Sequence, residues 1–179
     1  MHAHAHSMSK SSRVSGFGLI EVLVAVLLVS IGLLGAAGMH VRAVEYTMDT
    51  ERRQMAAMVA SELMETMRSD TTTVLQATGA PKTDLGGYAK AKDAALPTVT
   101  TADCTPLSSD PGKRLGCWGA RAKRVIPELP DTLITSAFTV GADATTNVVS
   151  ITVAWPVKKG QCLDGNDNEY CTYTLRSRL

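Results

Sequence analysis

One carboxyl group lies inside a long apolar segment of this sequence. Glu21 is the charged residue within the run from Phe17 to Met39. A carboxylate at the centre of a membrane helix costs about 2.5–3.5 kcal/mol, so such a group usually has a function and a partner. A glutamate near the end of a membrane helix can instead extend to the lipid headgroups. The position of Glu21 alone is compatible with both interpretations.

Four cysteines form the second set of reactive side chains: Cys104, Cys117, Cys162 and Cys171. All of them lie beyond the apolar segment. An even number of cysteines on one side of a membrane predicts disulfides in an oxidising compartment such as the periplasm or the cell exterior. Four cysteines allow three different pairings. A structural zinc site is less favoured, because no two cysteines have the tight Cys-x-x-Cys spacing.

The remaining polar clusters indicate no catalytic centre. The segment Asp164–Glu169 gathers oxygen ligands suited to Ca²⁺ but lacks EF-hand spacing, so a solvated turn is the better interpretation. His40 has no patterned partner for a catalytic triad. Six methionines fit packing in a helix core better than a soft-metal site; they are Met39, Met48, Met55, Met58, Met64 and Met67. We expect no enzymatic activity, no cofactor and no metal.

A long helix must carry Glu21. At about 1.5 Å per residue, the segment Phe17 to Met39 is long enough to cross about 30 Å of hydrocarbon. Beyond it, apolar residues recur every three or four positions, so the helix is predicted to continue to about Ser69 over roughly 80 Å. Its second half, about Met48 to Met67, is expected to be half buried under a sheet.

The rest of the chain predicts an antiparallel sheet packed on this helix. Residues 71–111 are rich in Thr, Ala, Gly, Asp and Pro and predict mostly loop with short helical or strand pieces. A helix carrying Trp118 is predicted from Lys113 to Ile126. Apolar and polar residues then alternate in three segments, Phe138–Val140, Val149–Trp155 and Cys171–Leu175. The predicted fold class is α+β, with a small antiparallel sheet on a long helix.

The amino-terminal sequence resembles the class III signal of type IV pilins and pseudopilins. A basic leader ends in Gly16, Phe17 follows, Glu21 is the fifth residue after the glycine, and an unbroken apolar run comes next. The resemblance implies that prepilin peptidase cuts between Gly16 and Phe17 and methylates the new amino terminus. It also implies that Glu21 meets the amine of a neighbouring subunit's Phe17 inside a fibre, where low dielectric penalises an unpaired carboxylate. A conventional signal cleaved at Gly35–Gly38 is less favoured, because it gives Glu21 no role.

The expected organisation has four parts. Residues 1–16 are a leader peptide with a tag or an extended start, 17–39 a transmembrane helix, 40–69 its periplasmic continuation, and 70–179 a globular pilin domain. Lys10 and Arg13 hold the leader in the cytoplasm by the positive-inside tendency, which implies a single pass through the inner membrane. Without these two residues, 16 of the 18 basic residues remain against 17 acidic ones, so we expect no nucleic-acid partner. Five basic residues are interpreted as a charged helix face and a loop: Arg121, Lys123, Arg124, Lys158 and Lys159.

Scattered features further resemble the PilV-type minor pilins, namely Glu21–Ala25, Ile31–Gly35, Glu65–Asp70, a Trp-bearing helix ending near Leu129–Pro130, and Ile151–Trp155. This resemblance implies a priming complex at the pilus tip, on the cell surface, that contains other minor and major pilins and supports a PilY-type adhesin. The implied partners also include the inner-membrane assembly platform and inner-membrane lipid. Many pilins have a cystine-bounded loop near their end, which favours pairing Cys104 with Cys117 and Cys162 with Cys171. A type II secretion pseudopilin and a DNA-uptake minor pilin are the alternatives.

Overall fold

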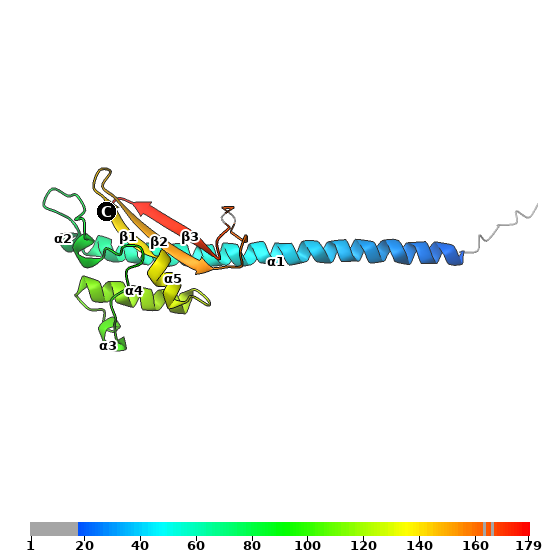
Figure 1. The fold of residues 1–179 in the computed structure, drawn as a ribbon, viewed down its shortest axis with the longest axis horizontal. Coiled ribbons are helices and arrows are strands. Elements are labelled where there is room, and N and C mark those ends of the chain that lie inside the picture. Colours follow the sequence, from blue (N-terminus) through cyan, green and yellow to red (C-terminus); the bar gives the residue numbers. More distant parts are fainter. Residues whose placement is uncertain (1–17, 163, 166) are drawn as a thin grey trace, which may run out of the picture. The chain divides into compact units, whose positions relative to one another are not determined.

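The long helix and the sheet are both present in the computed structural model, which describes residues 18–162, 164–165 and 167–179. Figure 1 shows the elements in chain order. The described residues fall into two units that meet in the sequence between Val44 and Glu45. This division lies within the long helix. The predicted α+β fold, with a long helix and a small antiparallel sheet, is confirmed.

Helix α1 extends over 51 residues, Leu19–Ser69, as the sequence predicts. No proline interrupts this range. Glu21 lies in the first turn and Arg68 in the last, so the charges at both ends complement the helix dipole. By length and composition, α1 contains a segment able to cross a membrane, and none of that segment is buried.

Three antiparallel strands form the sheet: β1 (Thr139–Asp143), β2 (Val148–Pro156) and β3 (Tyr170–Ser177). Their order is β1-β2-β3, so β2 is central. β-branched and aromatic residues dominate β2, as suits a half-buried pleated strand. Val149, Ile151, Val153 and Trp155 are completely buried, which confirms the predicted apolar face of this strand.

Shorter helices connect α1 with the sheet: α2 (Thr71–Val74), η1 (Leu85–Gly87), α3 (Thr101–Cys104), α4 (Pro111–Val125) and α5 (Asp131–Ala137). The first three are the short pieces expected within a mainly irregular segment. Helix α4 is the predicted helix around Trp118; it begins where the Asp110 side chain accepts a hydrogen bond from the Lys113 amide. Helix α5 was not predicted, because its 7 residues, DTLITSA, carry no clear helical period.

Two tryptophans connect the buried face of α1 to the rest of the second unit. The indole N–H of Trp118, on α4, donates to the carbonyl of Val59 at 2.8 Å, and its ring lies 5.6 Å from that of Phe138. The indole N–H of Trp155, on β2, donates to Oδ1 of Asp49 at 3.2 Å. The core therefore lies between α1, α4 and the sheet.

The prediction that all six methionines lie in the core is wrong. Met64 and Met67 are buried, but the side chains of Met39, Met48 and Met58 are 70%, 48% and 52% exposed. The inner face of α1 is defined by small and apolar residues such as Ala56, Val59, Ala60 and Leu63, and the exposed methionines do not share it. Methionine spacing alone could not distinguish the two faces of the helix.

A buried lysine closes the β1 side of the sheet. The Lys90 amide donates to the Val140 carbonyl at 2.8 Å, and the Val140 amide donates back at 2.9 Å. Its ammonium donates to the carbonyls of Phe138 at 2.7 Å and Thr135 at 3.0 Å, and to that of Ala91 at 3.3 Å. Burial lowers the pKa of Lys90 because the charged form loses water. The backbone of Lys90 thus occupies the outer edge of β1 at Val140.

A polar cluster at the end of α1 joins three elements. Asp70 accepts hydrogen bonds from the hydroxyl of Tyr88 and from the guanidinium of Arg114, both at 3.2 Å. Thr73 donates to the other carboxylate oxygen at 2.7 Å. Burial raises the pKa of the Tyr88 hydroxyl above its usual range. Because each of these groups has a hydrogen-bond partner, we interpret the cluster as a structural one that holds the end of α1 to the segments carrying Tyr88 and Arg114.

Candidate assembly surface

Glu21 lies in the first turn of α1, at its exposed end. Its amide donates to the Gly18 carbonyl at 2.9 Å, which closes the first helical turn. The side chain is exposed, and it has no ion pair with any residue in the described ranges. The predicted cleavage and methylation positions, Gly16 and Phe17, lie outside the described residues. The carboxylate of Glu21 is therefore available to a cation supplied by another molecule.

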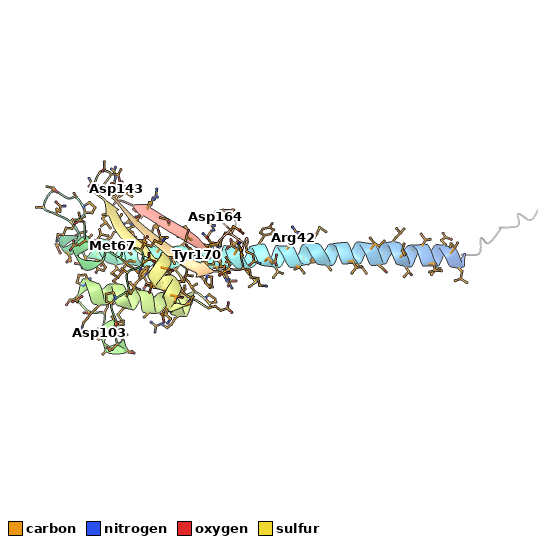
Figure 2. All side chains as sticks on the ribbon, viewed as in Figure 1. Arg42, Met67, Asp103, Asp143, Asp164 and Tyr170 are labelled. Carbon is orange, nitrogen blue, oxygen red and sulfur yellow. A yellow bond between two sulfur atoms is a disulfide. The ribbon has the colours of Figure 1, made fainter. Side chains whose placement is uncertain are left out.

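The first unit presents an apolar surface to its surroundings. Large apolar residues from Leu19 to Val44 are 48–84% exposed, and side chains project both above and below the helix in Figure 2. At Gly32, Gly35 and Gly38 an added Cβ atom would meet nothing within 4 Å. These glycines therefore serve no packing contact among the residues that the structure describes. A surface of this kind needs lipid or other apolar helices around it.

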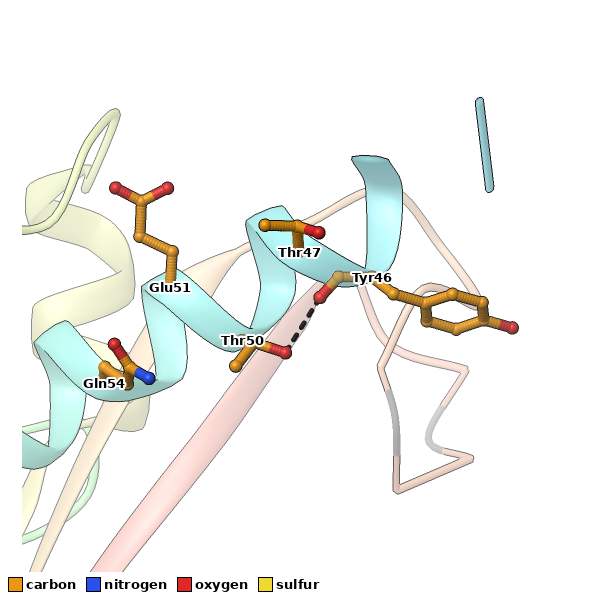
Figure 3. Close-up of a pocket in the computed structure, with 5 residues that line it drawn as sticks. All are labelled: Tyr46, Thr47, Thr50, Glu51 and Gln54. Carbon is orange, nitrogen blue, oxygen red and sulfur yellow. Dashed lines mark hydrogen bonds between the residues drawn. The ribbon is translucent and has the colours of Figure 1, made fainter. Parts of the chain in front are cut away.

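A groove lies on α1 just after this apolar surface, within the second unit. It has a volume of about 410 Å³ and is lined by Tyr46, Thr47, Thr50, Glu51 and Gln54 (Figure 3). The hydroxyl of Thr50 donates to the Tyr46 carbonyl at 2.9 Å. Four of the lining residues, Thr47 to Gln54, have the spacing of a hole that receives a side chain of a neighbouring helix. This groove could not be predicted from the sequence, because its residues are polar and show no apolar periodicity.

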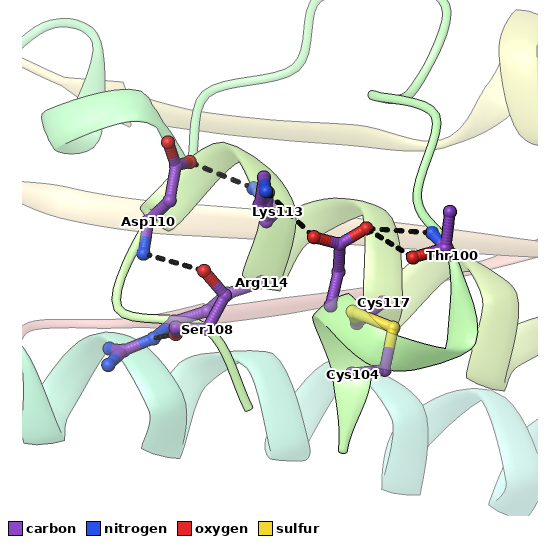
Figure 4. The surroundings of a disulfide bond; sticks show 8 residues. Thr100, Cys104, Ser108, Asp110, Lys113, Arg114 and Cys117 are labelled. Carbon is purple, nitrogen blue, oxygen red and sulfur yellow. Dashed lines mark hydrogen bonds and ion pairs between the residues drawn. A yellow bond between two sulfur atoms is a disulfide. The ribbon is translucent and has the colours of Figure 1, made fainter. Parts of the chain in front are cut away.

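The structure contains the disulfides Cys104–Cys117 and Cys162–Cys171, which is the favoured sequence-adjacent pairing. The first joins α3 to α4, and an ion pair reinforces the same junction (Figure 4). Asp103 accepts from the ammonium of Lys113 at 2.7 Å and from both the amide and the hydroxyl of Thr100. These hydrogen bonds, that of Lys113 first, hold the pKa of Asp103 well below its usual range. The pKa of Lys113 is raised in return.

Three of the five basic residues that could form a nucleic-acid surface are ion-paired. Arg121 contacts Glu62 at 2.8 Å, Lys123 contacts Asp131 at 2.8 Å, and Lys159 contacts Asp167 at 3.2 Å. Paired surface cations offer little free charge to a phosphate backbone. Within the described ranges, no group of three or more His, Cys, Asp or Glu side chains is placed to hold a metal ion.

A comparison with protein families assigns the amino-terminal segment. Residues 11–37 match the family model of the prokaryotic N-terminal methylation motif. This match supports a place for the chain in the type IV pilin superfamily. Neither a curated protein nor a solved structure matches it.

The family match suggests a role for the apolar end of α1. A class III signal implies processing by prepilin peptidase and assembly with other pilins. The exposed apolar helix fits membrane anchoring before assembly. The match supports a type IV pilin-like protein of a pilus or a pseudopilus, and it suggests a structural rather than an enzymatic role.

Proposed function

We propose that the chain is a minor pilin of the type IV pilus that helps to prime fibre assembly. The observation that carries the proposal is the exposed carboxylate of Glu21 in the first turn of an apolar helix, within the matched motif. In a bilayer or a helix bundle, this charge is costly unless a cation lies beside it. A freshly exposed amino terminus on a neighbouring subunit would supply that cation.

Processing creates the partner charge. Cleavage between Gly16 and Phe17, followed by methylation of the Phe17 nitrogen, leaves a secondary amine that is positive at neutral pH. Each subunit then carries a cation at its first residue and an anion at Glu21. The amine of one subunit can therefore form an ion pair with the Glu21 carboxylate of its neighbour. Because the surrounding side chains are apolar, relative positions of two helices that leave these charges unpaired are disfavoured. The ion pair therefore specifies the axial offset between neighbouring subunits.

Two features support a location of the second unit outside the cytoplasm. The basic leader residues Lys10 and Arg13 favour a cytoplasmic start, and both disulfides favour an oxidising compartment. Before assembly the chain is then a single-pass inner-membrane protein with residues 45–179 in the periplasm. The PilV-like features support a place in a tip complex with other minor and major pilins, built on the inner-membrane platform and presenting a PilY-type adhesin.

A pair of isosteric substitutions tests the role of Glu21. Glu21→Gln removes the charge and keeps the shape, while Glu45→Gln makes the same change at an exposed position of α1 beyond the matched motif. We expect the chain to disappear from sheared fibres in the first variant and to remain in the second, with equal amounts of both in the membrane. Equal incorporation of the two variants would contradict the proposal.

A type II secretion pseudopilin is the second candidate, since the matched motif serves both pili and pseudopili. A deletion strain separates the two functions. Loss of surface fibres with normal protein secretion supports the pilus, and loss of secretion with normal fibres supports the pseudopilus. A DNA-uptake role has less support, because Arg121, Lys123 and Lys159 are already ion-paired.

A further inference from the structure

The two edge strands of the sheet, β1 and β3, differ in whether their outer backbone groups are hydrogen-bonded. At β1, the backbone amides of Lys90 and Val140 each donate a hydrogen bond to the carbonyl of the other residue. The ammonium of Lys90 also donates to the Phe138 carbonyl. At β3, the neighbour on one side is β2 and no further strand follows among the described residues (Figure 1). An uncovered edge is a template for another strand, and natural proteins usually cover or blunt it.

The register identifies which groups of β3 face outward. The Val157 amide donates to the Glu169 carbonyl at 3.0 Å, so these two residues form a hydrogen-bonded pair of the antiparallel ladder. Such pairs alternate along a ladder, and the next are Trp155 with Cys171 and Val153 with Tyr173. The backbone groups of the residues between them, Thr172, Thr174 and Arg176, therefore point away from β2. Within the described part of the chain, these outward amides and carbonyls have no hydrogen-bond partner.

The side chains beside this edge also lack a cover. Tyr173 and Leu175, on the inner face of β3, pack against the core but are only partly buried. Thr174 and Arg176 lie on the opposite face and are not buried. The guanidinium of Arg176 has no ion pair among residues 18–162, 164–165 and 167–179. An added strand would complete the backbone ladder and extend the core over Tyr173 and Leu175.

We propose that the outer edge of β3 binds a β-strand of a different subunit in the assembly. That strand alternates apolar residues, which cover Tyr173 and Leu175, with polar residues that include a carboxylate opposite Arg176. Main-chain hydrogen bonds provide the affinity, and the alternating side chains provide the selectivity. The inference rests on the proposed function only in placing the chain beside other subunits in the membrane.

A second copy of this chain is a poorer occupant. Two β3 edges paired antiparallel around Thr174 would place each Arg176 opposite Thr172 and leave both guanidinium groups without an anion. A strand from another chain can supply that anion.

A proline substitution can test hydrogen bonding at the outer edge of β3 without disrupting the sheet. At position 174 the amide points outward, so Thr174→Pro removes an edge donor and keeps the ladder to β2; prolines are tolerated at such positions. Thr174→Val is the matched control, because it also loses the hydroxyl but keeps the amide. Near-ultraviolet circular dichroism and disulfide content should be the same for both variants, which verifies that the sheet is intact.

Photocrosslinking in living cells provides the readout, with the full-length chain carrying a benzophenone amino acid at Thr172. We expect a discrete adduct whose crosslinked peptide comes from another subunit and alternates apolar with polar residues. The yield should fall about fivefold or more with Thr174→Pro and stay unchanged with Thr174→Val. The same probe at Thr152, on the central strand, should give no such adduct.

The outcomes distinguish this inference from the proposed function. An adduct that persists with Glu21→Gln, although the chain has left the fibres, supports edge pairing independently of fibre entry. Absence of an adduct at Thr172, equal yields for the proline and valine variants, or a crosslinked peptide from a second copy of β3 would overturn the proposed occupant. None of these results depends on whether pili or secretion fail in the deletion strain.

Discussion

The contact between Trp155 and Asp49 allows the most direct test of how the sheet is held on α1. Asp49 is 6% exposed; its Oδ1 accepts from the Trp155 indole at 3.2 Å, and its Oδ2 is buried without a hydrogen-bond partner among the described residues. The substitution Trp155→Phe removes the donor but keeps an aromatic ring under the guanidinium of Arg53, which lies 5.8 Å from the indole. The carboxylate of Asp49 then has neither oxygen paired.

The magnitude follows from these contacts. A hydrogen bond to a charged group contributes about 1.5–3 kcal/mol, and the smaller side chain leaves a void worth about 1 kcal/mol. We expect Trp155→Phe to lower the free energy of unfolding by about 2.5–4 kcal/mol. In the Asp49→Asn background the acceptor is neutral, so the same change should cost about 1.5–2.5 kcal/mol. The coupling between the two positions is then about 1–1.5 kcal/mol.

The assay is urea denaturation of the full chain in detergent micelles, followed by near-ultraviolet circular dichroism with the disulfides intact. Trp118→Phe is the matched control, because its indole donates to a neutral carbonyl, that of Val59. Its cost should be the same with Asp49 or Asn at position 49. A coupling below about 0.5 kcal/mol for Trp155, or equal coupling for both tryptophans, would refute the reasoning.

Three further predictions concern the second unit. The pKa of Asp103 is lower in the folded chain than in the unfolded one, so its contribution to stability is present above about pH 4 and is lost as the pH falls further. Asp103→Asn should therefore flatten the acid limb of a melting-temperature profile, and an unchanged limb would argue against it. Replacing Cys104 and Cys117 together by serine should cost about 3 kcal/mol in urea denaturation, because their disulfide closes a short loop of sequence separation 13. Lys90→Met should cost about 1–3 kcal/mol by the same assay, since buried carbonyl groups lose their donor, and a neutral effect would show that water replaces it.

Strong periodicity accounts for what could be predicted from the sequence. The apolar run and the helical spacing up to Met67 determined α1, and the alternation from Val149 to Trp155 determined the central strand. Both signals extend over many residues, so single exceptions do not hide them. The match of residues 11–37 to the methylation motif agrees with the resemblance seen around Glu21.

Features that depend on tertiary contacts could not be read in the same way. Whether Met58 or Met64 enters the core depends on which side of α1 meets the sheet, and the methionine spacing is equal evidence for both. Lys90 occurs in a segment without periodicity, and its burial follows only from the nearby carbonyls of Thr135 and Phe138. The free edge of β3 likewise became visible only once the strand order and the register were known.

The contacts between α1 and the last strands can form only late in translation. Arg52 donates to the carbonyl of Pro156, which lies 104 positions later, and Arg68 donates to Ser177, 109 positions later. A ribosome adds residues at about 5–20 per second, so the inner face of α1 exists for several seconds before any strand arrives to cover it. During that interval Val59, Leu63 and Met67 are open to chaperones or to the bilayer surface. Translation pauses before β2 would lengthen this interval.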